Sequence, residues 1–140
     1  MQTKHAKLVT ELVAAWNAHN AERVATLYAA QHEGFDSGLM EPLNGPEAVQ
    51  AYCANFFAAF PDAHIQVEEI VAEEDRCAVA WQAQGTHLGK LMNIPPSSKV
   101  VNIRGMSILT IEEGKFTRSN TIWDMAAFLR AIGLLPRLTR

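Results

Sequence analysis

Cysteine is scarce in this chain, and no stretch of it is apolar enough to cross a membrane. The 140 residues include only Cys53 and Cys77, each within an apolar run. A free thiol in such a setting is more often a small buried hydrophobe than a ligand or nucleophile. Residues 1–7 lack an apolar signal core, and no segment reaches the roughly 18 apolar residues of a membrane helix. We therefore expect reduced cysteines, no membrane partner and a cytoplasmic location.

Positive charge is not in excess either. The formal net charge is −3, which gives no electrostatic basis for binding a phosphate backbone, so we expect no nucleic-acid partner. The histidines are scattered, and no group of His, Cys or acidic residues has the spacing of a metal site. The composition, 49% hydrophobic and 19% charged, is that of an ordinary globular protein. The length predicts one domain over residues 1–140.

Helical periodicity is concentrated in the first sixty residues. Apolar residues at intervals of three and four predict a helix over 6–16, and Asn20 can cap a second helix that carries Tyr28. A third helix is expected from Gly45 to Phe60, where the following proline ends it. The segment 31–44 is expected to be loop and short strand.

Strand periodicity dominates the rest of the sequence. Alternation or β-branched runs predict four longer strands over 65–71, 77–83, 101–111 and 116–124, and helical spacing returns over 125–132. Helices grouped first and strands grouped second favour an α+β fold in which a curved, mostly antiparallel sheet wraps over three N-terminal helices.

The predicted strands contain polar atoms in otherwise apolar sequence. A solid core rarely accepts polar groups without partners, whereas a cavity tolerates them when ligand or water completes their hydrogen bonds. We therefore expect an internal pocket. The positions concerned are Trp81, Arg104, Met106, Asn120 and Asp124.

A set of short motifs in the last two thirds of the chain carries a family likeness. They are Ala59-Phe60-Pro61-Asp62, Gly85-Thr86-His87-Leu88-Gly89, Ile94-Pro95-Pro96, Gly105 with Ile108, Glu113-Gly114-Lys115, Trp123-Asp124 and Gly133-Leu134-Leu135-Pro136. In order and spacing this set resembles the SnoaL-like polyketide cyclases, also called the ester cyclase family, of the nuclear transport factor 2-like superfamily.

The resemblance implies a cone-shaped α+β fold with a ligand pocket between the curved sheet and the helices. It also implies a homodimer, a hydrophobic small-molecule ligand, and no metal or organic cofactor. In polyketide cyclases of this type, an aspartate at the position matching Asp124 acts as general acid and base in an intramolecular aldol ring closure. Asn120 and Thr110 depart from the residues that the family often has at these positions.

Asp124 has two compatible interpretations from the residues alone. An Asp directly before Met125 is a good helix N-cap. Strand alternation counted from Phe116 also puts Asp124 on one face with Asn120 and Ile122, so its carboxylate can look into an apolar cavity. Desolvation there would favour the neutral carboxyl group, as acid–base catalysis requires, whereas the amides at a helix start favour the charged form.

The other candidate residues surround this aspartate in the expected site. His87 either orients a substrate carbonyl or tunes Asp124, or is a structural histidine at the end of a strand. Arg104 either pairs with Glu68 or Glu69 across the sheet or binds an acidic ligand group. The expected pocket wall consists of Trp81, Arg104, Met106, Asn120, Trp123, Tyr28 and Phe56.

The residues and the family resemblance together leave three functions open. We favour an enzyme of the lyase or isomerase class that performs cofactor-independent aldol cyclisation or isomerisation on a hydrophobic carbonyl compound. The alternative is a non-catalytic small-molecule-binding or dimerisation domain of the same fold, which the unusual Asn120 and Thr110 motivate. A third reading is an epoxide hydrolase that would use Arg104 and Asp124 with Asp36 or Glu41.

Overall fold

The structure is a computed structural model, and it describes residues 4–138. Its helices are α1 (Lys4–Asn17), α2 (Ala21–Ala25), α3 (Gly45–Ala59) and α4 (Met125–Ala131). Its strands are β1 (Tyr28–Asp36), β2 (His64–Glu73), β3 (Arg76–Thr86), β4 (Val100–Glu112) and β5 (Lys115–Trp123).

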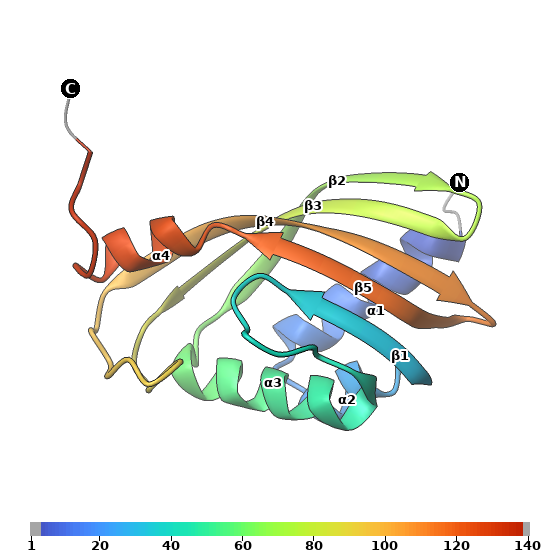
Figure 1. Cartoon of the computed structure of the whole chain (residues 1–140), viewed down its shortest axis with the longest axis horizontal. Helices are drawn as coiled ribbons and strands as arrows, with labels where there is room; N and C mark the ends of the chain where they lie inside the picture. The colour runs from blue at the N-terminus through green and yellow to red at the C-terminus, as the bar shows by residue number, and fades with distance from the viewer. Residues whose placement is uncertain (1–3, 139–140) are drawn as a thin grey trace.

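The five strands form one curved sheet in the order β1-β5-β4-β3-β2 (Figure 1). β2, β3, β4 and β5 pair with one another in antiparallel fashion, whereas β1 joins the edge of the sheet parallel to β5. The expected α+β class with a mostly antiparallel curved sheet is therefore confirmed.

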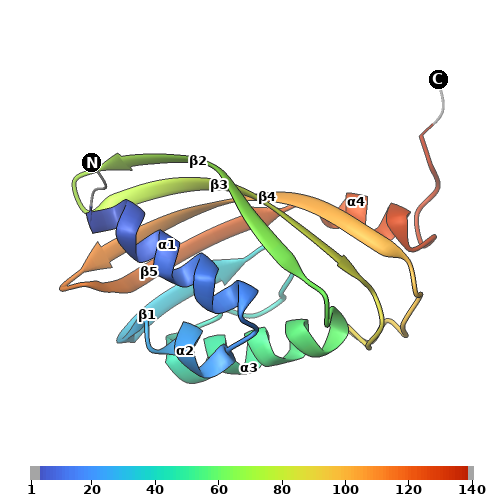
Figure 2. The same ribbon diagram turned by 180° about the vertical axis from the view of Figure 1, so that it is seen from behind.

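The first three helices lie on one side of this sheet (Figures 1 and 2). The Asn20 side chain caps α2 by accepting a hydrogen bond from the Arg23 amide over 3.0 Å. Pro46 stands in the first turn of α3, where its missing N–H costs no hydrogen bond, and Pro61 follows the helix end. α4 lies at the end of the sheet opposite to the start of α1.

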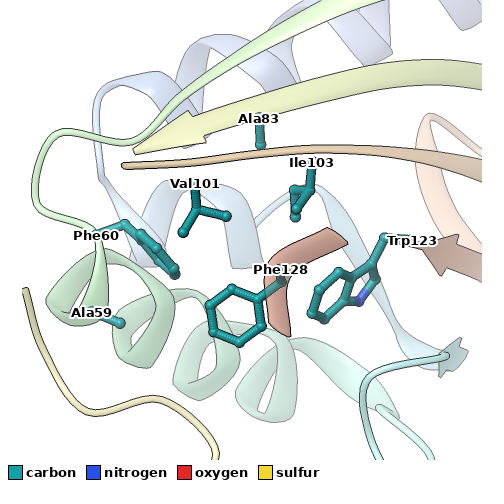
Figure 3. Close-up of a cluster of buried hydrophobic side chains, with 7 residues drawn as sticks. All are labelled: Ala59, Phe60, Ala83, Val101, Ile103, Trp123 and Phe128. Atoms are coloured by element: carbon teal, nitrogen blue, oxygen red, sulfur yellow. The ribbon is translucent and has the colours of Figure 1, made fainter. Parts of the chain in front are cut away.

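Among the described residues, three clusters of buried apolar side chains hold the helices to the sheet and to one another. One is formed where Phe128 of α4 and Phe60 meet β3, β4 and β5 (Figure 3). A second joins α1 to the other half of the sheet, and a third joins α1 and α2 to α3. The space between these clusters is where the cavity described below lies.

The sequence prediction was wrong about the edge strand β1. Tyr28 begins a nine-residue strand and does not belong to a helix, because α2 ends at Ala25. The inward positions of β1 include His32, Gly34 and Asp36, none of which is aliphatic, so the usual alternation of a half-buried strand is missing.

Candidate functional site

A cavity of about 130 Å³ lies between the sheet and helices α1 and α3. Its wall is mostly apolar and aromatic, and Asp36 is the only Asp, Glu, Lys or Arg among its lining residues within the described part of the chain. The lining residues are Leu12, Val13, Trp16, Tyr28, Phe35, Asp36, Leu43, Val49, Tyr52, Cys53, Phe56, Ile65, Val79, Trp81, Ala83, Ile103, Ser107, Leu109, Ser119, Thr121 and Trp123.

Asp36 stands at the end of β1 and is only 6% exposed. Three donors hold its carboxylate. The indole Nε1 of Trp123 and the backbone amide of Gly38 both donate to Oδ1 over 2.8 Å, and the Tyr52 hydroxyl donates to Oδ2 over 3.2 Å. A buried carboxylate with three donors is fixed in position, and of its roughly four lone-pair sites one, on Oδ2, remains without a donor.

The bond from Trp123 to Asp36 depends on a glycine in the loop after β1. A Cβ atom on Gly38 would lie 2.5 Å from Cζ2 and 3.0 Å from Nε1 of Trp123. No side chain fits at this position while the indole lies against the loop. Gly38 thus lets the indole reach Asp36.

Tyr52 and Tyr28 add two hydroxyls to the wall. Burial and the neighbouring charge of Asp36 raise the pKa of Tyr52 well above its ordinary value, so Tyr52 stays protonated and donates. Burial is also the main cause that raises the pKa of Tyr28. The rings of Tyr28 and His32 meet edge to face, with ring centroids 4.7 Å apart.

A wider groove of about 380 Å³ adjoins the cavity. The two spaces share three wall residues, Tyr52, Phe56 and Trp123. Lys90 and the loop that follows it line the outer side of the groove.

Four of the residues expected in the pocket wall do line the cavity. Trp81 and Trp123 reach it from β3 and β5, Tyr28 from β1, and Phe56 from α3. Trp123 is 9% exposed and also belongs to the buried cluster beside α4 (Figure 3).

Three other expected pocket residues lie on the opposite face of the sheet. Met106 is 66% exposed, Asn120 is exposed, and the Arg104 side chain is 73% exposed. Arg104 forms a two-pronged ion pair with Glu68, at 3.0 and 2.8 Å, which is the cross-sheet alternative for this residue. The expectation that these three side chains face the pocket is wrong.

A β-bulge explains part of this error. Opposite β4, Ile111 pairs with Phe116 but Thr110 pairs with Arg118, so Thr117 is an extra residue in β5. Such an insertion reverses which face each later residue occupies. Alternation counted from Phe116 therefore assigns Asn120 to the wrong side of the strand.

Asp124 lies on the surface and caps α4. Its Oδ1 accepts a hydrogen bond from the Ala127 amide over 2.9 Å, and the residue is exposed. It is not among the residues that line the cavity. The expectation that this carboxyl group looks into a dry hollow is wrong, and the helix-cap interpretation describes its position.

His87 is fully buried, but it lies apart from the cavity lining. Its Nδ1 accepts from the Ser97 amide over 3.3 Å and lies 3.0 Å from the Ser97 hydroxyl, and its ring meets those of Phe60 and Phe128. Burial lowers the pKa of His87, so the ring is neutral. This placement is that of a structural histidine at a strand end.

From the sequence, Asp36 enters only as a candidate residue of an epoxide hydrolase site, together with Arg104 and Asp124. The structure does not bring these three residues together, because Asp36 faces the cavity while Arg104 and Asp124 face outward. Small or polar residues at three alternate positions, His32, Gly34 and Asp36, were the signal that could have identified the site.

Two further features are absent from residues 4–138. No three His, Cys, Asp or Glu side chains gather in a way that could hold a metal ion. None of the helices has both the length and the apolar character that a membrane crossing requires.

Comparison with known proteins identifies relatives of this fold. AclR, a candidate hydroxylase from Streptomyces galilaeus, is 25% identical with a TM-score of 0.85, covering 96% of this chain and 87% of that one. IdmH, a candidate polyketide cyclase from Streptomyces antibioticus, is 23% identical with a TM-score of 0.79, covering 91% and 97%.

A third similar structure holds a ligand. This protein from Catenulispora acidiphila, with a ketosteroid isomerase-like fold, is 19% identical with a TM-score of 0.80, covering 96% and 98%, and was solved in complex with trimethylamine. No curated protein matches the chain. The family model for SnoaL-like polyketide cyclase matches residues 6–132. This match covers nearly the whole sequence, and the chain belongs to the SnoaL-like polyketide cyclase family.

Proposed function

We propose that the protein binds a compact hydrophobic carbonyl compound in the cavity and moves a proton to and from its α-carbon through Asp36. The single observation that carries this proposal is the position of Asp36. Among residues 4–138 it is the one Asp, Glu, Lys or Arg that lines this mostly apolar cavity, and three donors hold its carboxylate there.

The proposed reaction conserves charge inside the cavity. The Asp36 carboxylate takes a proton from the α-carbon, the carbon–hydrogen bonding pair becomes the enolate, and the negative charge moves to the carbonyl oxygen. The same carboxyl group then returns the proton to the α-carbon. Alternatively, the enolate carbon attacks a second carbonyl to close a ring, and the alkoxide so formed takes the proton from Asp36. The apolar wall excludes water, which strengthens each electrostatic interaction with the enolate.

Exchange of α-protons in D₂O provides the test. We would follow cyclohexanone and the larger ketone 2-tetralone by proton NMR in the presence of the protein. The Asp36→Asn variant keeps the shape of the side chain but removes its basicity, so the exchange rate should fall by about 10²-fold or more.

The matched control is the same change at the other candidate aspartate. Asp124→Asn retains a good helix cap and should leave the exchange rate unchanged. Loss of exchange in Asp124→Asn together with normal exchange in Asp36→Asn would reverse the assignment. Exchange that survives in both variants would refute acid–base chemistry by either residue.

A second candidate function is non-catalytic binding of a small organic cation. Aromatic rings surround a single carboxylate in the cavity, and this combination attracts ammonium groups through ring quadrupoles and charge. The relative from Catenulispora acidiphila holds trimethylamine. Titration with trimethylammonium should then show saturable binding that Asp36→Asn abolishes, without exchange of either ketone.

A further inference from the structure

Two short hydrogen-bond chains end at hydroxyl groups in the cavity wall. In the first, the Gly45 amide donates to Nδ1 of His32 over 3.2 Å, and Nε2 of His32 lies 2.8 Å from Ser119 Oγ. Because Nδ1 accepts, the single ring proton of neutral His32 lies on Nε2 and is donated to Ser119. The Ser119 hydroxyl has no further hydrogen bond within residues 4–138, so its own proton remains available.

The surroundings of His32 keep this arrangement fixed. His32 is 2% exposed, and burial lowers its pKa, against which the charge of Glu33 acts as a smaller cause. A Cβ atom on Gly34 would lie 2.8 Å from Cε1 of His32 and 3.0 Å from Ser119 Oγ. The backbone at Gly34 therefore lies directly against the pair, and a larger residue at this position would displace it.

The second chain begins at an indole. Trp81 Nε1 donates to Ser107 Oγ over 3.2 Å, and Ser107 Oγ lies 2.8 Å from the Thr121 hydroxyl. Whichever of the two hydroxyls donates in that contact, one proton of the pair is left without an acceptor in the described part of the protein.

These hydroxyls stand beside the carboxylate that we propose as the base. Thr121 pairs with Asp36 on β1 and with Ser107 on β4, so the three residues lie in one row across the sheet. Ser119 follows on the same face, two residues away along β5, which is about 7 Å. A ketone can therefore place its α-carbon within reach of the Asp36 carboxylate and its carbonyl oxygen within hydrogen-bond reach of the Ser119 hydroxyl.

We propose that Ser119, together with the Ser107–Thr121 pair, forms a two-donor site for the ligand's carbonyl oxygen, and that His32 is the positioning residue for Ser119. The proposal rests on the proposed function above, and it adds the protein groups that would hold the carbonyl oxygen of the substrate. A free anion is excluded by the charge of Asp36 on the same wall, so the acceptor that fits is the oxygen of a neutral carbonyl group.

The donors matter most after proton abstraction, when the oxygen carries the negative charge. Preorganised hydroxyls stabilise this enolate more than the starting ketone, and loss of one such donor typically lowers kcat by about 10²-fold. We expect Ser119→Ala to lower kcat for α-proton exchange by this order with little change in KM. Ser119→Thr, which keeps a hydroxyl, should restore much of the loss.

The carbonyl stretching frequency of bound cyclohexanone separates this inference from the proposed function. The measurement uses the Asp36→Asn protein, in which no exchange is expected. Hydrogen bonds to the ketone lower the frequency, and Ser119→Ala should shift it back toward its value in an apolar solvent. Thr117→Val is the matched control, because the Thr117 hydroxyl bonds the Thr110 carbonyl and does not line the cavity.

His32→Phe tests the positioning role, since phenylalanine keeps a ring and removes both nitrogens. We expect the carbonyl frequency to move as in Ser119→Ala, and nitrogen NMR of the unaltered protein should show His32 protonated on Nε2 alone. An unchanged frequency in Ser119→Ala overturns the donor site even if Asp36→Asn abolishes exchange. Exchange that persists in Asp36→Asn while the frequency still depends on Ser119 refutes the base and leaves the donor site standing. Failure of both ketones to bind overturns the inference.

Discussion

Replacing Gly38 with alanine should release the central carboxylate from one of its donors. The added Cβ would lie 2.5 Å from Cζ2 and 2.9 Å from Cε2 of Trp123, where carbon atoms in contact are about 3.5–4.0 Å apart. The indole must therefore move by about 1 Å. The Trp123–Asp36 hydrogen bond of 2.8 Å does not survive a displacement of that size.

The expected cost has two parts. Overpacking typically costs about 1–3 kcal/mol, and a lost hydrogen bond to a charged group costs about 1.5–3 kcal/mol. Gly38 has no positive φ, so backbone strain adds nothing and alanine brings the usual gain of about 0.4–1 kcal/mol from a stiffer unfolded chain. We therefore expect the free energy of unfolding to fall by about 2–5 kcal/mol.

Urea unfolding measures this change, and the proton signal of the Trp123 indole N–H reports the hydrogen bond. Gly114→Ala is the control, because Gly114 has φ of 75° and nothing within 4 Å of its added Cβ. That variant should lose about 1–2 kcal/mol through backbone strain and leave the indole signal unchanged. A Gly38→Ala protein with unaltered stability and an unaltered indole signal would refute the reasoning.

Three further predictions concern residues that do not line the cavity. The free energy of unfolding should fall as the pH is lowered from 7.5 to 5.5, by at most about 1.4 kcal/mol per pH unit for each of His32 and His87. Burial lowers the pKa of both histidines in the folded protein, so the unfolded chain takes up protons first, near pH 6.5. A free energy of unfolding by urea that does not change over this range would contradict the prediction. Asp124→Ala should cost about 1 kcal/mol through the lost cap, with ketone exchange intact by NMR. The homodimer stays a prediction, and the exposed sheet face that carries Met106 and Ile122 is the interface to test. Sedimentation of the unaltered protein should find a dimer, and Met106→Glu should dissociate it. A monomeric unaltered protein would contradict the prediction.

The fold could be predicted where local signals agree with one another. Apolar spacing and capping residues located α1, α3 and α4, and alternation located β2 to β5. The motif set identified the family, which the match over residues 6–132 confirms. Apolar spacing reports which face of an element is buried, and capping residues report where a helix ends. Both can be recognised from residues close together in the sequence.

The site could not be predicted in the same way. β1 was underestimated because its inward positions carry His32, Gly34 and Asp36, none of which is aliphatic. Asp36 lines the cavity, and His32 bonds Ser119 of the cavity wall. The outward orientation of Asn120 follows from the bulge at Thr117, which no single-sequence pattern reveals. Local rules thus failed where the chain departs from regular packing, which is where a functional site is expected.

Phe56 is the residue that should set the size of the ligand. It lines both the inner cavity of about 130 Å³ and the outer groove of about 380 Å³. An engineered cavity of about 150 Å³ holds benzene, so the inner space suits a single small ring. Tyr52 and Trp123 also border both spaces, but neither can move without giving up its hydrogen bond to Asp36.

Phe56→Ala should therefore join the two spaces while the carboxylate keeps its donors. We expect the rate of α-proton exchange for 2-tetralone to rise relative to that for cyclohexanone, measured by NMR on mixtures of the two ketones. Leu12→Ala is the matched control, because Leu12 borders the inner cavity but not the groove, and its loss adds volume without opening a passage. An equal change of preference in both variants would mean that cavity volume alone, and not the connection through Phe56, selects the ligand.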